Sequence, residues 1–149
     1  MTTQYAVADP FLLAKFWVEI DGVVNGFFTG CSGLTVETET FEYAEGGMNE
    51  FVHKLPVRTR FSNVVLKRGW VETDELWNWY ARCISGQFET KSVGIILYEN
   101  KGQSQAAPKA RWDLIQAYPV RWQGPDFQSD SAAVVVETFE LAHQGWRRQ

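Results

Sequence analysis

The stretch FEYAEGGMNEF, residues Phe41–Phe51, interrupts a long strand pattern and decides how the surrounding chain is interpreted. Its first residues alternate between aromatic and charged side chains, which predicts a β-strand with one polar face. Two adjacent glycines, Gly46 and Gly47, then stop the pattern, because glycine weakens strand interiors and often marks a turn. We interpret the glycines as the end of a body strand, after which an extended loop runs from about Glu42 to Arg60.

Alternating or apolar runs on both sides of this loop predict further β-strands. The predicted strands are FWVEI (16–20), GLTVETETFEY (33–43), FSNVVLKRGW (61–70), KSVGIILYEN (91–100), ARWDLIQAYPVRW (110–122) and AAVVVETFELAH (132–143). Two turn signals, Asp21-Gly22 and Asn25-Gly26, indicate a hairpin after the first of them without fixing its tip. The predicted fold is mainly β: a small antiparallel barrel or sandwich, with one flanking helix.

One segment, TDELWNWYARCISG (73–86), has helical periodicity. Thr73 is suited to cap its first turn, and Gly86 is placed to end it. An apolar stripe runs along one side, as is typical of a helix face packed against a core. The residues of this structural stripe are Leu76, Trp77, Tyr80, Cys83 and Ile84.

Length and composition favour one folded domain over residues 1–149. The net charge of −4 argues against a dedicated nucleic-acid-binding protein. The first residues lack the basic and apolar regions of a signal peptide, and no apolar run reaches the length of a membrane span, so we expect no membrane anchor. With only two cysteines the chain is not a disulfide scaffold.

The residue types that usually carry chemistry are few. Cys31, Cys83, His53 and His143 have no local spacing of a zinc site or of a Cys–His catalytic pair. The sequence therefore predicts no catalytic residues, no metal and no cofactor. Glu137 is an irregularity, because it shares an apolar strand face with Phe139. Three explanations are open: Glu137 lies where that face opens to solvent, it pairs with a residue across a subunit contact, or it lies at a partly exposed edge.

Several motifs, taken in order, resemble one family. They are FWVEIDG…GFFTGCSGL, EYAEGG, FSNVVLKRG, LWNWY, AYPVRWQGP and VVVETFELAHQG. In this order, and over nearly the whole chain, they resemble the inner tail-tube protein of contractile bacteriophages and contractile injection systems. The chain departs from many relatives at Ala44, where they have a basic residue, and at Val57, where they have glycine.

The resemblance implies a structural protein and not an enzyme. Members of the family form hexameric rings that stack into a hollow tube, through which DNA or effector cargo passes. The partners implied are further copies of the chain, the surrounding sheath protein, and baseplate and cap proteins. Assembly is expected in the cytoplasm of the producing bacterium, followed by incorporation into a phage tail or injection particle.

The family also places its ring-to-ring loop in this part of the chain, from about Glu42 to Arg60. The residues expected to form that inter-ring loop are Glu42, Tyr43, Glu45, Gly46, Gly47, Asn49, Glu50, Lys54, Arg58 and Arg60. Acidic residues lie on the outgoing limb and basic residues on the returning limb, so opposite charges are available to pair between rings.

Two alternatives remain open from the sequence. The first is a tube initiator or adaptor ring at the baseplate of the same machine, although the compact length favours the main tube. The second is a ligand-binding β-barrel or an enzyme, because a barrel mouth can hold a small molecule. No convergent cluster of polar residues in the sequence supports this second alternative.

Overall fold

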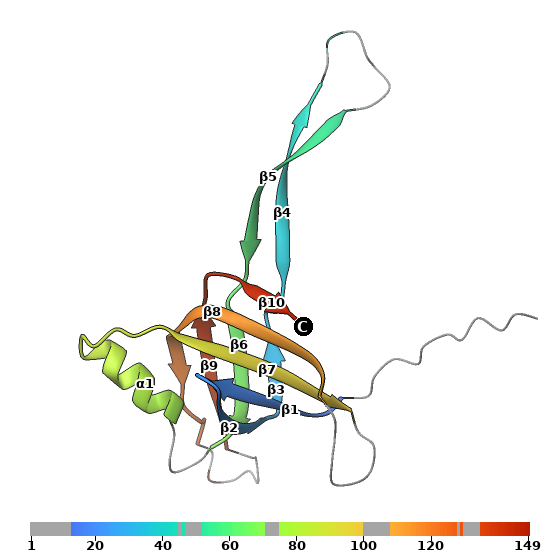
Figure 1. Cartoon of the computed structure of the whole chain (residues 1–149). Coiled ribbons are helices and arrows are strands. Elements are labelled where there is room, and N and C mark those ends of the chain that lie inside the picture. The colour runs from blue at the N-terminus through green and yellow to red at the C-terminus, as the bar shows by residue number, and fades with distance from the viewer. Residues whose placement is uncertain are drawn as a thin grey trace, which may run out of the picture.

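A computed structural model describes most of the chain as a β-rich body with a long two-stranded projection (Figure 1). The described residues are 13–44, 46, 52–70, 75–99, 108–127, 129 and 135–149. Some residues discussed above lie outside these ranges, namely Glu45, Gly47, Asn49, Glu50 and Thr73.

The described elements are ten strands and one helix. In chain order they are β1 (Leu13–Ile20), β2 (Val23–Phe28), β3 (Gly30–Ser32), β4 (Val36–Tyr43), β5 (His53–Phe61), β6 (Val64–Gly69), α1 (Glu75–Ile84), β7 (Lys91–Glu99), β8 (Pro108–Gln123), β9 (Val136–Ala142) and β10 (Trp146–Arg148). We call the β4–β5 projection the arm. The prediction of a mainly β fold with a flanking helix is confirmed.

The body is one antiparallel sheet that folds over into two layers. Its strand order is β2-β1-β7-β8-β9-β6-β3, and β10 also pairs with β8. The long strand β8 belongs to both layers, because its first part pairs with β7 and its last part with β9. The change of partner occurs near Gln116, whose φ of 48° lies in the left-handed region. The result is sandwich-like and not a closed barrel.

The first hairpin shows how local sequence sets a turn. Asp21 and Gly22 both have positive φ, and Ile20 pairs directly with Val23 across them. This is the two-residue connection whose twist suits flanking strands. The hairpin tip is therefore at Asp21-Gly22, and Asn25-Gly26 lies inside β2.

The core lies between the two layers of the body. Its buried side chains come from inward positions of β1, β2, β6, β7, β8 and β9. The buried apolar residues include Phe16, Val18, Phe28, Val64, Leu66, Val93, Ile95, Leu114, Phe139 and Leu141. Glu137 is also buried, at 1% exposure, where its Oε1 accepts a 2.6 Å hydrogen bond from Arg68 Nε. The expectations that it is exposed or pairs across a subunit contact are wrong.

Helix α1 forms where predicted and ends at Gly86. Gly86 N–H donates to the Cys83 carbonyl and Gln87 N–H to the Arg82 carbonyl, and Gly86 has φ of 98°. These two hydrogen bonds are those of a Schellman cap. The helix therefore ends because glycine accepts the left-handed conformation that the cap requires.

The buried face of α1 differs from the predicted stripe. Leu76 and Trp79 are buried, while Trp77 is 39% and Ile84 65% exposed. Tyr80 and Cys83 pack against the core, as predicted. At about 100° per residue, Trp79 lies on the opposite side of Leu76 from Trp77 and Ile84, so the buried face is rotated relative to the prediction.

Candidate assembly interface

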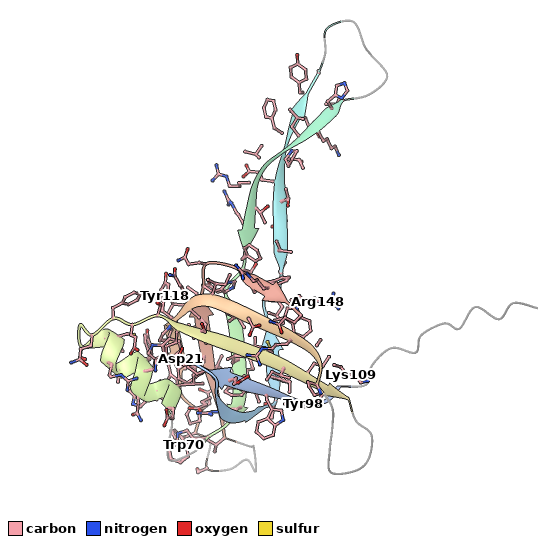
Figure 2. The ribbon with its side chains drawn as sticks, viewed as in Figure 1. Asp21, Trp70, Tyr98, Lys109, Tyr118 and Arg148 are labelled. Atoms are coloured by element: carbon pink, nitrogen blue, oxygen red, sulfur yellow. The ribbon has the colours of Figure 1, made fainter. Side chains whose placement is uncertain are left out.

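The arm consists of two exposed strands. All eight residues of β4 and all nine of β5 are exposed. Side chains leave the arm on both faces, and the arm extends away from the body (Figure 2). The sequence pattern predicted that residues 33–43 form a strand of the body and that the chain leaves the body at Gly46 and Gly47. That interpretation is wrong, because the chain has already left the body at β4.

Gly33 marks the real point of departure. Its φ is 91°, and a Cβ there would collide with the Asn63 carbonyl oxygen. The returning chain is held beside it by a hydrogen bond of 3.2 Å from Ser62 N–H to the Thr35 carbonyl. At Gly46, by contrast, an added Cβ would have nothing within 4 Å. The tight backbone crossing that needs glycine is therefore at the base of the arm.

The half of the arm next to the body has a charged face. Glu37 pairs in register with Arg60, and Glu39 with Arg58. The Glu39 carboxylate lies 3.2 Å from Arg58 Nε and 3.6 Å from Arg60 Nη2. Arg58 and Arg60 thus have an acidic partner within the arm, whereas the sequence suggested pairing between rings. Exposed pairs of this kind stabilise by about 0–1 kcal/mol each.

The outer half of the arm has an apolar face. A bulge between Glu39 and Thr40 separates it from the charged half, and beyond it Phe41 pairs with Leu55 and Tyr43 with His53. Phe41 is 56% exposed and Leu55 53%. Residues at alternate positions of one strand share a face, so Phe41 and Tyr43 lie on the side that carries Glu39. Large apolar side chains gathered on an exposed surface mark a contact site.

Aromatic packing holds the base of the arm against the body. The Phe61 ring lies 5.5 Å from that of Trp146 and 6.1 Å from that of His143. Gly145 N–H donates to His143 Nδ1, so the ring proton is on Nε2, which donates to the Ser62 carbonyl. The arm therefore has a defined attachment to β10 and the segment before it.

Six predicted loop residues are described, and all lie in the arm or at its tip: Glu42, Tyr43, Gly46, Lys54, Arg58 and Arg60. Glu42 and Lys54 are register partners. Glu39, Phe41 and Leu55 also lie in the arm, although they are not among the predicted loop residues. A signal for the charged half was present, because Glu-Thr-Glu-Thr (37–40) alternates in the same way as Arg-Thr-Arg (58–60).

Histidines and cysteines do not gather into a reactive site. His53 is on the outer arm and His143 at its base, while Cys31 and Cys83 are free and on separate elements. Burial raises the pKa of the Cys31 thiol to about 11, which disfavours the nucleophilic thiolate. Among the described residues, no group of three or more His, Cys, Asp or Glu side chains is placed to hold a metal ion.

A second charged group lies across β1, β7 and β8. Arg111 donates from Nη1 to Glu19 at 2.6 Å and from Nε to Asp113 at 2.7 Å. These carboxylates, Asp113 first, raise the pKa of Arg111. Gly94 leaves room for the guanidinium, since a Cβ there would lie 2.7 Å from Arg111 Nη2. The group contains two carboxylates and one guanidinium, and Arg111 links β8 to β1 across the intervening strand β7.

Comparison with known proteins gives consistent matches. Three solved structures superpose over nearly all of the chain. One is from the anti-feeding prophage (AFP) baseplate, with 28% identity, TM-score 0.81, and coverage of 96% of this chain and 97% of that one. Two are from an extracellular contractile injection system, PVC. Its sheath/tube terminator gives 26% identity, TM-score 0.82, and coverage of 97% and 99%. Its sheath-tube complex gives 26% identity, TM-score 0.80, and coverage of 100% and 97%.

No curated protein matches the chain. Within the described part of the chain, no helix has the length and apolar character needed to cross a membrane. The family model for the T4-like virus tail tube protein gp19 matches residues 13–147. This confirms the resemblance drawn from the sequence motifs. The chain belongs to the T4-like virus tail tube protein gp19 family, whose members are structural components and not enzymes.

Proposed function

We propose that the chain is the repeating subunit of the inner tube of a contractile phage tail or contractile injection system. In this role it forms hexameric rings, and the rings stack into a hollow conduit for DNA or effector cargo. The arm is the inter-ring contact of each subunit. Its residues Glu42, Tyr43, Gly46, Lys54, Arg58 and Arg60 belong to that contact, together with Phe41 and Leu55.

The observation that carries this proposal is the exposed arm. A two-stranded hairpin alone is marginally stable in water, and this one has Phe41, Leu55 and Tyr43 about half exposed. Contact with another molecule would remove those side chains from water and stabilise the arm. A subunit that repeats along a tube supplies such a contact at every ring.

The proposed partners follow from the same assembly. They are further copies of the chain, a surrounding sheath protein, and baseplate and cap proteins at the tube ends. Related chains occur in a sheath-tube complex and in a baseplate. We expect assembly in the cytoplasm of the producing bacterium, before the chain becomes part of a tail or particle.

Purified protein tests the proposal directly. We expect rings with an open centre in negative-stain micrographs, and tubes at high concentration. A protein that sediments only as a monomer over a wide concentration range, with no rings in micrographs, would contradict the proposed function. Rings that never stack would instead favour the initiator or adaptor role, since related chains occur at the baseplate and in the tube terminator.

A shortened arm tests the role of the arm. Residues 40–57 are replaced by Asn-Gly, which joins the register partners Glu39 and Arg58 through a two-residue turn. We expect a folded body and normal rings that do not stack. A second variant keeps the full length of the arm but carries Phe41→Ser and Leu55→Ser. We expect the same loss of stacking from it, because the apolar side chains and not the length of the arm would then be missing. Long tubes from the shortened protein would show that the arm is only a connector.

A further inference from the structure

One half-buried histidine joins the arm to the body. His143 follows the last residue of β9, and both of its ring nitrogens bond backbone groups. Nε2 donates at 2.8 Å to the carbonyl of Ser62, the residue directly after β5, and Nδ1 accepts at 3.0 Å from Gly145 N–H. The imidazole therefore connects the arm to the segment that leads into β10, which lies beside the base of the arm (Figure 1).

Only the neutral imidazole makes both of these hydrogen bonds. A backbone N–H is always a donor, so Nδ1 accepts through its lone pair, and in neutral imidazole only the other nitrogen carries a proton. In the charged ring both nitrogens are donors. Protonation of Nδ1 would set two N–H groups against each other across the 3.0 Å between Nδ1 and the Gly145 nitrogen. That hydrogen bond would then be lost.

The backbone around Gly145 is held in place, so it cannot turn away from a charged ring. The Gly145 carbonyl accepts a 2.8 Å hydrogen bond from Ile115 N–H, and Gln144 N–H donates at 2.8 Å to the Ile115 carbonyl. Gly145 has φ of 126°, and a Cβ there would lie 3.3 Å from Phe61 Cε2. Strand β8 and the Phe61 ring thus fix the direction of the Gly145 N–H.

The surroundings offer a charged ring no compensating partner. Among the described residues, no Asp or Glu carboxylate lies within 4.0 Å of a His143 nitrogen. The Trp146 ring packs against Phe61, as His143 does, and its buried indole N–H has no hydrogen-bond partner in the described part of the chain. Protonation of His143 would add a donor to a site that already lacks acceptors.

Ionisable side chains on the strands around the ring lie on other faces or have partners of their own. Neighbouring residues of a strand point to opposite faces, so those next to Phe61 and Trp146 point away from the aromatic group. Glu140 pairs in register with Arg121. The ionisable residues nearest to the contacts of the ring are Arg60 on β5, Lys67 on β6, Asp113 and Tyr118 on β8, Glu140 on β9, and Arg147 on β10.

We propose that His143 is a pH-sensitive link between the arm and the body. Histidine is the side chain that ordinarily changes charge between about pH 5 and pH 8. The closed base of the arm contains the neutral ring, whereas a loosened base accepts either form. The closed base is therefore fully stabilised at high pH and loses this stabilisation as the pH falls. Acid loosens the base of the arm while the core of the body stays folded.

Amide hydrogen exchange, followed residue by residue by NMR, tests this link in the full-length protein. The amides of interest are Gly145, which bonds His143, and Ser62, which bonds the Thr35 carbonyl across the base of the arm. Rates are corrected for the intrinsic effect of pH and compared with that of Leu66, in body strand β6. Between about pH 8 and about pH 5, we expect protection at both amides to fall about three- to tenfold relative to Leu66, the factor that one hydrogen bond supplies.

Two variants separate the titration of His143 from its shape. His143→Gln retains an N–H donor for Ser62, and His143→Asn retains an acceptor for Gly145, but neither side chain gains a proton in this pH range. Both should be less protected than the unmodified protein at high pH and lose nothing further as the pH falls. His53→Gln changes the other histidine, on the outer arm, and is the matched control. It should keep the full pH dependence.

Two outcomes would overturn the proposed link. One is unchanged protection of Ser62 and Gly145 in the unmodified protein between high and low pH. The other is a loss at low pH that persists in both His143 variants, because another group would then be responsible. The measurement requires neither rings nor tubes, so its result is independent of the proposed function.

Discussion

The body and the arm each contain an ion pair between arginine and glutamate, in opposite environments. In the body, Arg68 and Glu137 side chains are 9% and 0% exposed, and their nitrogen and oxygen lie 2.6 Å apart. In the arm, Arg58 and Glu39 side chains are 59% and 50% exposed, with 3.2 Å between them. Loss of one partner should therefore cost much more stability in the body than in the arm, because water screens the arm pair and is excluded from the body pair.

The two regions also differ in what completes them. The body buries alternate residues of its strands against one another, so its folding depends on its own core. The arm buries none of its strand residues. Its charged half has ion pairs within the arm, whereas its apolar half has the cross-strand pairs of β4 and β5 and, in the proposed function, gains further stability from a partner. Changes in the body should therefore alter folding, and changes in the outer arm should alter assembly.

The largest effect is expected at the buried ion pair. Glu137→Ala leaves the Arg68 charge buried without its partner, which should lower the free energy of unfolding by about 3–5 kcal/mol. Urea unfolding of the subunit measures this. A double variant, Arg68→Met with Glu137→Leu, removes both charges and should recover most of the loss. Equal instability of the single and double variants would show that packing, and not the unpaired charge, controls this site.

The rotated face of α1 gives the next comparison. Trp79 is 1% exposed, and its indole donates to the Glu89 carbonyl at 2.9 Å. Trp79→Ala should cost about 3–5 kcal/mol. Trp77→Ala should cost only about 1–2 kcal/mol, because part of that side chain is already in water. Thermal unfolding of both variants compares the two losses of stability. A larger loss for Trp77→Ala would show that the buried face is the stripe predicted from the sequence.

The glycines at the two ends of the arm test where the chain leaves the body. Gly33→Ala introduces both a positive-φ strain and a collision with the Asn63 carbonyl, so we expect a loss of about 2–3 kcal/mol. Gly46→Ala has open space around it and should change stability by less than about 0.5 kcal/mol. Chemical denaturation measures both. A larger effect at Gly46 than at Gly33 would show that the glycine at the tip, and not the one at the base, is required for the conformation of the arm.

The smallest effect is expected in the charged half of the arm. Glu39→Gln should change subunit stability by less than about 1 kcal/mol. Added salt should weaken tubes little, because we expect the apolar side chains Phe41 and Leu55 to provide most of the affinity of the proposed inter-ring contact, and salt screens mainly its exposed charges. Tube length at low and high salt is measured by electron microscopy. Dissociation of tubes at high salt would show that charge pairs between rings carry the contact after all.

Local patterns in the sequence were sufficient to predict most strands of the body and its helix. Alternating or apolar runs predicted strands at 61–70, 91–100 and 132–143, and the structure has strands at 64–69, 91–99 and 136–142 within them. Gly86 predicted the helix end, because few other residues adopt the conformation of its cap. The order of motifs was sufficient to identify the family, and the match of the family model over residues 13–147 confirms it.

Other features required the folded structure, because they depend on residues distant in sequence. Glu137 has the same position in a strand pattern whether it is exposed or paired, and only the approach of Arg68 on β6 decides between them. The face that α1 buries depends on where β8 meets it. Gly33 is needed because Asn63, thirty residues later, passes close to its backbone.

The arm shows the same division most clearly. Its alternating residues specify a strand whether or not another layer covers it, so the sequence alone assigns β4 to the body. The pairing of β4 with β5, apart from the main sheet, leaves both faces in water. Local sequence thus determines that this segment is extended, while tertiary packing determines which faces are covered, because burial is a property of neighbours that the local pattern does not contain.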